Sequence, residues 1–276
     1  AVYVEDNVFN YAFPNDGAQD AYAGARYVFR FNTVNGTNIE HHGADSGGFR
    51  GVHSFEIYGN NFTLARGHWR MFYFRSGTGA LFDNVWTGPF DGNEFNVYRA
   101  RPENFPPWGA CNGSSAWDGN RGSRLNPGWP CLDQTGYVFT QNPGGSYTSV
   151  PMYLWNNFTN GGPMPDPKAA ETSTAPYLVL NRDFYNAVAS FTGAAGVGRG
   201  PIGARPSSCT TGVAYWATDE GEWNSNHPGP DGRLYRCEAT NKWILHYMPY
   251  VYPHPLSAGS PSPQPPPVPH TLSIIR

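Results

Sequence analysis

A short pattern that returns about every 25 residues constrains the fold more than any other feature of this sequence. Apolar residues alternate along a strand-like stretch, an asparagine follows, and an apolar or aromatic residue stands two positions later. The asparagines are Asn7, Asn32, Asn60, Asn84 and Asn156, at intervals of 25, 28, 24 and 72 residues. Because 72 is three times 24, the long interval fits three periods, although it also contains an insertion with two cysteines.

A period near 25 residues with strand-like alternation and no helical stripe is typical of one coil of a parallel β-helix, in which stacked coils share a core. Asparagines that stack at strand spacing can join their amides in a ladder of hydrogen bonds. Asparagine also tolerates the left-handed backbone of a sharp corner. The alternative is that each asparagine marks an independent β-turn of a sandwich or a propeller. The near-constant period favours the β-helix.

The pattern divides the chain into three parts. Residues 1–200 are expected to form the coils, with a disulfide-bonded insertion at about residues 100–135 and a short helical segment near residues 181–191. Residues 201–256 are expected to form a small β module, and residues 257–276 a Pro-rich tail that ends in a strand-like segment. Since residue 1 already lies inside a coil, we expect preceding coils or another chain to cover that end.

The four cysteines form two pairs that are close in sequence, Cys111 with Cys131 and Cys209 with Cys237. Neither pair has Cys-x-x-Cys spacing or histidines at finger spacing, so we expect no metal site and no cofactor. Two disulfides are expected instead, each stabilising its Gly- and Pro-rich loop by roughly 3–4 kcal/mol. Disulfides predict a secreted or cell-surface, extracellular protein.

Composition excludes several classes of protein. Charged residues make up only 14% of the chain and aromatic residues 16%, which is the reverse of the balance found in disordered proteins. The net charge of −3 gives no electrostatic footprint for nucleic acid. No apolar run approaches the roughly 20 residues of a membrane span. A structured chain with many strands and turns is therefore expected.

Four segments carry a resemblance to a known family: ARYVFRFNTV, HHGADSGGFRGVHSFEIYGNNF, CNGSSAWDGN and GVAYWATD with LYRCEATNKW. Over nearly all of residues 1–256 the chain resembles the C-terminal part of bacterial secreted right-handed β-helix proteins of the pectate-lyase-like superfamily. The resemblance implies an all-β fold, a right-handed parallel β-helix. It implies little about activity, because one fold serves many functions.

The catalytic signatures of that superfamily are missing from this chain. There is no Asp-Asp, Gly-His-Gly or Arg-x-Lys element of the polygalacturonase-like hydrolases, and no Arg-x-Pro-x-x-Arg element of the pectate lyases. The densest group of ionisable residues includes His41, His42, Asp45 and Arg50. A base with a carboxylate partner there could abstract a proton from a uronic acid. The alternative, which we favour, is a polar loop between coils.

Tryptophans in the insertion are the better candidates for binding. Trp108, Trp117 and Trp129 could offer flat platforms to sugar rings, with Asp118 accepting hydrogen bonds from hydroxyl groups. The alternative is that these tryptophans pack the disulfide loop against the coils. From the period, Trp69 and Arg70 could line the same face as the histidine cluster, one coil later.

These features predict an extracellular protein that interacts with a polysaccharide or glycan, by binding rather than by catalysis. A structural or adhesive subunit of a fibre or surface assembly is the alternative, with self-association through the N-terminal coil or the C-terminal tail. A third hypothesis is a polysaccharide lyase or hydrolase with a non-standard site.

Overall fold

The computed structural model describes residues 1–12, 17–43, 51–67, 69–90, 96–97, 135–140, 146–170, 175 and 178–256. This part of the chain is all-β and includes a short 3₁₀ turn, η4 (Ile202–Ala204). No helix in these ranges is long and apolar enough to cross a membrane. The chain forms two compact units, Ala1–Phe184 and Tyr185–Arg276.

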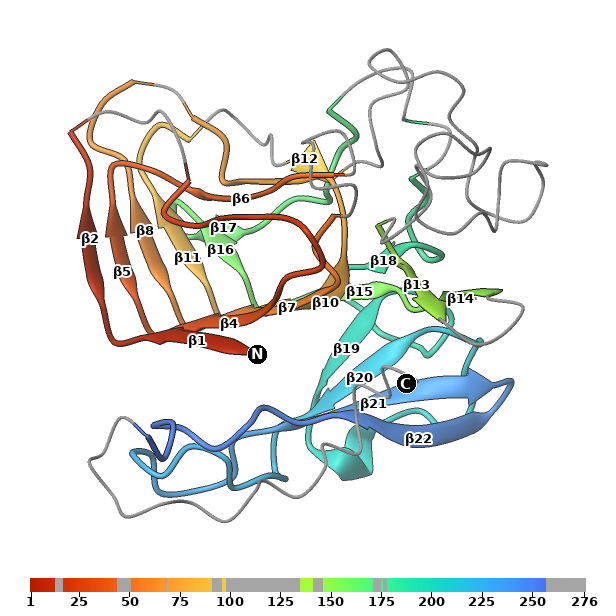
Figure 1. The fold of residues 1–276 in the computed structure, drawn as a ribbon. Coiled ribbons are helices and arrows are strands. Elements are labelled where there is room, and N and C mark those ends of the chain that lie inside the picture. Colours follow the sequence, from red (N-terminus) through yellow and green to blue (C-terminus); the bar gives the residue numbers. More distant parts are fainter. Residues whose placement is uncertain are drawn as a thin grey trace. The chain divides into compact units, whose positions relative to one another are not determined.

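Three sheets with mostly parallel strands build the first unit (Figure 1). The first sheet has the order β1 (Val2–Glu5), β4 (Arg26–Arg30), β7 (Ser54–Tyr58), β10 (Thr78–Phe82), β15 (Met152–Trp155) and β18 (Phe184–Tyr185). The second has β2 (Val8–Asn10), β5 (Thr33–Asn35), β8 (Asn61–Thr63), β11 (Val85–Thr87), β16 (Phe158–Thr159) and the antiparallel β17 (Gly162–Pro163). The third has β3 (Asp20–Ala21), β6 (Ile39–His41), β9 (Phe72–Phe74) and β12 (Asn96–Val97).

The chain visits these sheets in a fixed order. From β1 to β12 it passes through the first, second and third sheet in turn and then returns to the first. Each new strand pairs in parallel with the strand three positions earlier, as β4 does with β1 and β7 with β4. Equivalent residues of successive repeats therefore lie side by side.

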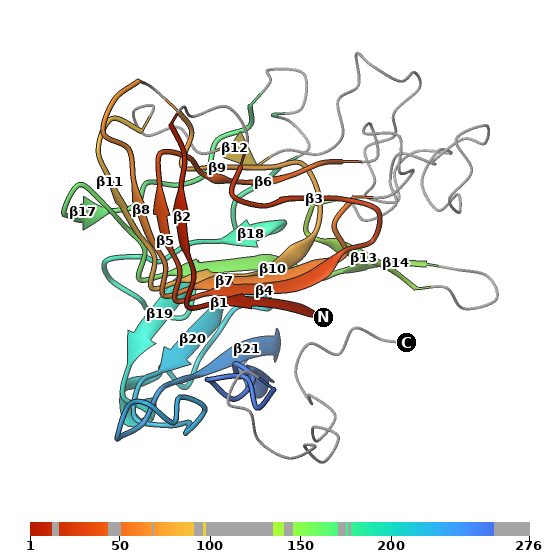
Figure 2. The ribbon, with the colours of Figure 1, turned by 60° about the vertical axis from the view of Figure 1, so that its left-hand side comes forward.

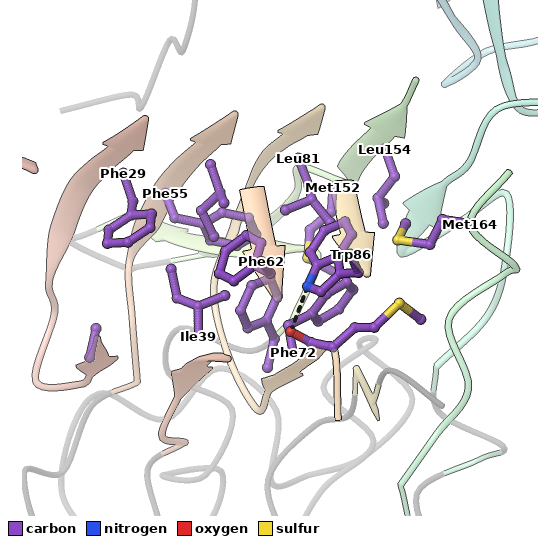
Figure 3. Packing of buried hydrophobic residues seen from close by; sticks show 14 of the residues in the cluster. Phe29, Ile39, Phe55, Phe62, Phe72, Leu81, Trp86, Met152, Leu154 and Met164 are labelled. Atoms are coloured by element: carbon purple, nitrogen blue, oxygen red, sulfur yellow. Dashed lines mark hydrogen bonds between the residues drawn. The ribbon is translucent and has the colours of Figure 1, made fainter. Parts of the chain in front are cut away.

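Side chains that point inward from the three sheets meet in one core (Figure 3). The first sheet supplies Phe29, Ile57 and Leu81 from neighbouring strands. The second supplies Phe62 and Trp86, whose rings stack with centroids 5.1 Å apart, and the Trp86 indole donates a hydrogen bond to the Met71 carbonyl. Because each inward residue packs on its counterpart in the next repeat, no repeat could bury its own inner face alone.

The predicted asparagine ladder is present between the first and second sheets. The Nδ2 atoms of Asn7, Asn32 and Asn60 each donate to the Oδ1 atom of the next asparagine along the stack, at 2.9–3.1 Å. The same Oδ1 atoms also accept the main-chain N–H of the preceding asparagine. Asn84 continues the ladder, with Nδ2 3.0 Å from Oδ1 of Asn157.

The last member of the ladder is Asn157, so the prediction of Asn156 is wrong by one residue. Asn156 occupies the corner position just before the ladder, with φ of 52°, and its side chain bonds to Asp83. The residue before every ladder asparagine has the same left-handed backbone: Asp6, Phe31, Gly59, Asp83 and Asn156. The sequence pattern failed here because it required an apolar or aromatic residue two positions later. In this last repeat that position holds Thr159, opposite Trp86.

The long interval is one repeat with an insertion, and not three periods. Strand β10 pairs directly with β15, and β11 with β16, so no further repeat lies between them. Within the interval, β13 (Tyr137–Thr140) and β14 (Ser146–Ser149) pair with each other as an antiparallel hairpin.

The second unit contains a four-stranded sheet of β19 (Val197–Gly200), β20 (Ala214–Ala217), β21 (Arg233–Ala239) and β22 (Lys242–Tyr247). β19 and β20 are parallel, and the other pairs are antiparallel. The predicted disulfide Cys209–Cys237 is present. The unit begins at Tyr185 and includes β19, so it starts before the residue 201 expected from the sequence. The helix expected near residues 181–191 is absent, and that segment includes β18.

Candidate functional site

In the third sheet, β3, β6 and β9 run side by side (Figure 2). Two rows of polar and aromatic side chains belong to its outward face. Strand alternation sends Ala21 and Phe74 into the core, so their neighbours point outward. The first row is Asp20, Glu40 and Tyr73, which are in register across the three strands. The second row follows two residues later, just past the end of each strand, and consists of Tyr22, His42 and Arg75.

His42 joins the second row to Asp20. Its Nε2 atom lies 2.7 Å from Oδ2 of Asp20, and its Nδ1 atom lies 2.6 Å from Nη2 of Arg75. A guanidinium group only donates, so Nδ1 must accept, and the imidazole proton must reside on Nε2, where it is donated to Asp20. Both ring nitrogens are therefore engaged, and neither is left to accept a proton from a ligand.

His41, the preceding residue, points the opposite way and is fully buried. Its ring stacks on Phe74 with centroids 3.9 Å apart. Nδ1 lies 3.3 Å from the Ser76 carbonyl, which makes it the donor, and Nε2 accepts from the hydroxyl of Tyr27. Burial lowers the pKa of His41 to about 3. His41 is therefore a neutral core residue that a substrate cannot reach.

The two carboxylates of the first row have different environments. Glu40 is only 9% exposed, and burial raises its pKa above the usual value, with the charge of Asp20 adding to the effect and a hydrogen bond from Asn38 opposing it. Asp20 keeps about a third of its side chain exposed beside His42. Asp20 is thus the carboxylate of the two that is accessible to a ligand.

Tyr22 supplies an accessible aromatic ring beside this network. It is 50% exposed, and its ring meets the His42 ring edge to face with centroids 6.5 Å apart. On the other side of the rows, the guanidinium of Arg70 lies 3.9 Å from the Tyr73 ring centroid, and that of Arg75 lies 5.0 Å from it. Arg70 therefore lies against Tyr73 of the first row, and its place on the face of His42 stays a prediction.

Trp69 does not serve as an exposed platform. It is partly buried, packs against the core, and its Nε1 atom is buried with no hydrogen-bond partner in the described ranges. Its main chain bridges to Phe90. The neighbours Trp69 and Arg70 have different environments because consecutive residues of an extended chain point to opposite faces.

The remaining predicted site residues lie outside the described residues: Asp45, Arg50, Trp108, Cys111, Trp117, Asp118, Trp129 and Cys131. In turn, sequence reasoning missed Asp20, Tyr22, Glu40, Tyr73 and Arg75. The signal that could have found them is the alternation in the short segments DAY, IEHH and FYFR, which places one polar or aromatic side chain on the outer face at every second residue.

Within the residues that the structure describes, no group of three or more His, Cys, Asp or Glu side chains could hold a metal ion. Comparisons of the chain with protein-family models, with curated proteins and with solved structures return no match.

Proposed function

We propose that the first unit is a right-handed parallel β-helix and that the chain binds carbohydrate outside the cell. The fixed order of the three sheets, the parallel pairing of each strand with its counterpart in the next repeat and the asparagine ladder support the β-helix. The resemblance to the pectate-lyase-like superfamily, from the sequence alone, supports the handedness. The disulfide Cys209–Cys237 supports an extracellular location.

One observation carries the carbohydrate proposal: the exposed Tyr22 ring lies beside Asp20 and His42, which keep about a third of their side chains exposed, while the buried Arg75 holds His42 in place. An exposed aromatic ring offers an apolar face to the C–H groups of a sugar, and adjacent charged groups exchange hydrogen bonds with its hydroxyls. These side chains lie at or just past the ends of neighbouring strands, and the main-chain N–H groups of His42 and Arg75 still bond to the adjacent repeat, so their spacing follows that of the sheet. The arrangement is suited to binding an extended glycan.

The same geometry disfavours the two histidines as general bases and leaves the accessible Asp20 as the group on which any cleavage would depend. A general base needs an accessible nitrogen or carboxylate within hydrogen-bond reach of the proton that it removes. Both nitrogens of His42 are engaged, and His41 is buried in the core. We therefore favour carbohydrate binding over a lyase or hydrolase activity that depends on His41 or His42.

A glycan panel with a matched pair of variants tests this proposal. In Tyr22→Ala, we expect affinity for the retained glycan to fall roughly tenfold or more, because about half a tyrosine ring of apolar contact is lost. Tyr11, which is 40% exposed but lies away from the two rows, provides the control as Tyr11→Ala. Retention of no glycan, or equal losses in both variants, would contradict the proposal, and release of short saccharides would favour catalysis.

The structural or adhesive subunit stays a prediction. Its support is that the edge strands β1 and β2 carry exposed apolar side chains, Val2 at 64% and Val8 at 66%. Light scattering over a range of concentrations tests it, since a monomer at every concentration would contradict self-association through this edge.

A further inference from the structure

A fixed arginine lies on one face of the sheet in the second unit. The Cζ atom of Arg205 is 4.5 Å from the ring centroid of Tyr235 and 5.2 Å from that of Trp243. The segment that carries Arg205 is held at both ends: the Tyr215 hydroxyl donates to the Pro201 carbonyl at 3.0 Å, and the Trp243 indole donates to the Pro206 carbonyl at 2.8 Å. The guanidinium group is therefore positioned before any ligand arrives.

A second arginine shares this face. Arg233 and Tyr235 are two residues apart on β21, opposite Ala217 and Tyr215 of β20, so their side chains leave the sheet on the same side. Both arginines are half-buried. Both also act electrostatically on the Tyr235 hydroxyl: burial raises the pKa of Tyr235, as does its hydrogen bond to Glu220, while Arg205 and Arg233 oppose the increase.

Each arginine has a buried donor without an acceptor. Nη1 of Arg205 and Nε of Arg233 are buried and have no hydrogen-bond partner in the described ranges. Within the same ranges, neither side chain forms an ion pair. Native proteins satisfy nearly all buried donors, and a buried N–H group without an acceptor costs free energy. Because neither guanidinium is paired with a carboxylate in these ranges, both positive charges remain available to an anionic ligand.

We propose that Arg205 and Arg233 form a binding site for the oxyanion of a negatively charged glycan, either a carboxylate or a sulfate ester. The in-plane N–H groups of an arginine match two oxygens of such a group, while the faces of the Arg205 guanidinium remain stacked on aromatic rings. The half-buried Tyr235 and Trp243 rings adjoin the arginines and offer apolar contact to a sugar.

Nearby acidic residues select against more highly charged polymers. Glu220 accepts a hydrogen bond from the Tyr235 hydroxyl at 2.6 Å, and Asp219 accepts one from the main chain of Ile202. Glu222 and Asp231 line the same cavity as Asp219, Glu220 and Arg233, so a polyphosphate chain would be repelled there. A glycan chain fits better, because its sugar rings carry hydroxyl groups and its charges are spaced apart. Its hydroxyl groups can bond both to the arginine donors and to the carboxylate acceptors of this site. The inference rests on the proposed function only for the glycan nature of the ligand.

Three polymers with one backbone test the site: dextran, carboxymethyl-dextran and dextran sulfate. We expect the full chain to bind one or both charged polymers more tightly than dextran. Arg205→Gln and Arg233→Gln should each weaken that binding roughly 10- to 100-fold, the effect of losing a hydrogen bond to a charged group. Arg205→Lys should recover only part of the loss, because lysine keeps the charge without the planar fork.

Arg199→Gln is the matched control, because Arg199 is an exposed arginine of β19 in the same sheet and its replacement changes the net charge equally. An equal loss in Arg199→Gln, or no preference for the charged polymers, would overturn the proposal. If Arg205→Gln unfolds the second unit, Arg233→Gln still decides the question. Tyr22→Ala separates the two sites. If this variant loses glycan binding, the proposed function stands. If charged-polymer binding is at the same time independent of Arg205 and Arg233, this inference is overturned.

Discussion

Acid should destabilise the first unit through His41, whose pKa burial lowers to about 3. The usual pKa of about 6.5 applies to the unfolded chain, so the unfolded state takes up a proton at mildly acidic pH while the folded state does not. The stabilising contribution of neutral His41 is therefore fully present above about pH 6.5 and is lost as pH falls from there towards 3. With these two values, the free energy of unfolding falls by about 2 kcal/mol between pH 7 and pH 5 and by about 3 kcal/mol by pH 4.

The double variant His41→Phe/Tyr27→Phe isolates this contribution. It keeps an aromatic ring at position 41 to stack on Phe74 and removes the Tyr27 hydroxyl, which would otherwise be buried without its partner. Because nothing at position 41 then titrates, urea unfolding at pH 7, 6 and 5 should show the wild-type protein losing about 2 kcal/mol more than the double variant. Other titrating groups, His246 among them, are present in both proteins and cancel in the difference.

The single variant His41→Phe provides the control. It leaves the Tyr27 hydroxyl buried and unpaired, so it should be about 1–3 kcal/mol less stable than the double variant at every pH, with no additional slope. If the wild-type protein and the double variant depend on pH equally, His41 is either accessible to water or protonated in the folded state, and the reasoning fails.

Three further predictions concern the scaffold, each measured by denaturant unfolding. Asn60→Ala should destabilise the first unit by about 2–4 kcal/mol, because it leaves buried donors of the preceding asparagine unpaired. Asn156→Gly at the corner should change stability by less than about 1 kcal/mol. Equal effects of the two variants would contradict the ladder register. Gly59→Ala should cost about 2 kcal/mol or more, since φ is +67° and the added methyl would lie 2.7 Å from the ring of Phe31; an unchanged midpoint would refute this. Cys209→Ser/Cys237→Ser opens a loop of 28 residues and should destabilise the second unit by about 3–4 kcal/mol while leaving the first unchanged; a loss in both units would show that they do not unfold independently.

The repeat and most of the ladder could be predicted from the sequence because both depend on residues at nearly constant intervals. From Asn7 to Asn84, ladder asparagines are 25, 28 and 24 residues apart, and each lies at the same corner between two strands. The candidate site has no such regularity: Asp20 and Glu40 are in register 20 residues apart, whereas Glu40 and Tyr73 are in register 33 residues apart. The connections around the third sheet vary in length, so a search with one period finds the corner and misses the outward rows.

Adjacent histidines show why a cluster of ionisable residues in a sequence is not yet a site. The sheet sends His41 into the core, where burial keeps it neutral, and His42 to the outer face, where it is bound by Asp20 and Arg75. The two are nevertheless coupled, because the Nε atom of Arg75 also donates to the His41 carbonyl at 3.2 Å. Arg75 is thereby anchored to the main chain of the strand that buries His41. A change in the packing of His41 should therefore displace Arg75 and weaken ligand binding at the outer face, even though no ligand can reach His41 itself.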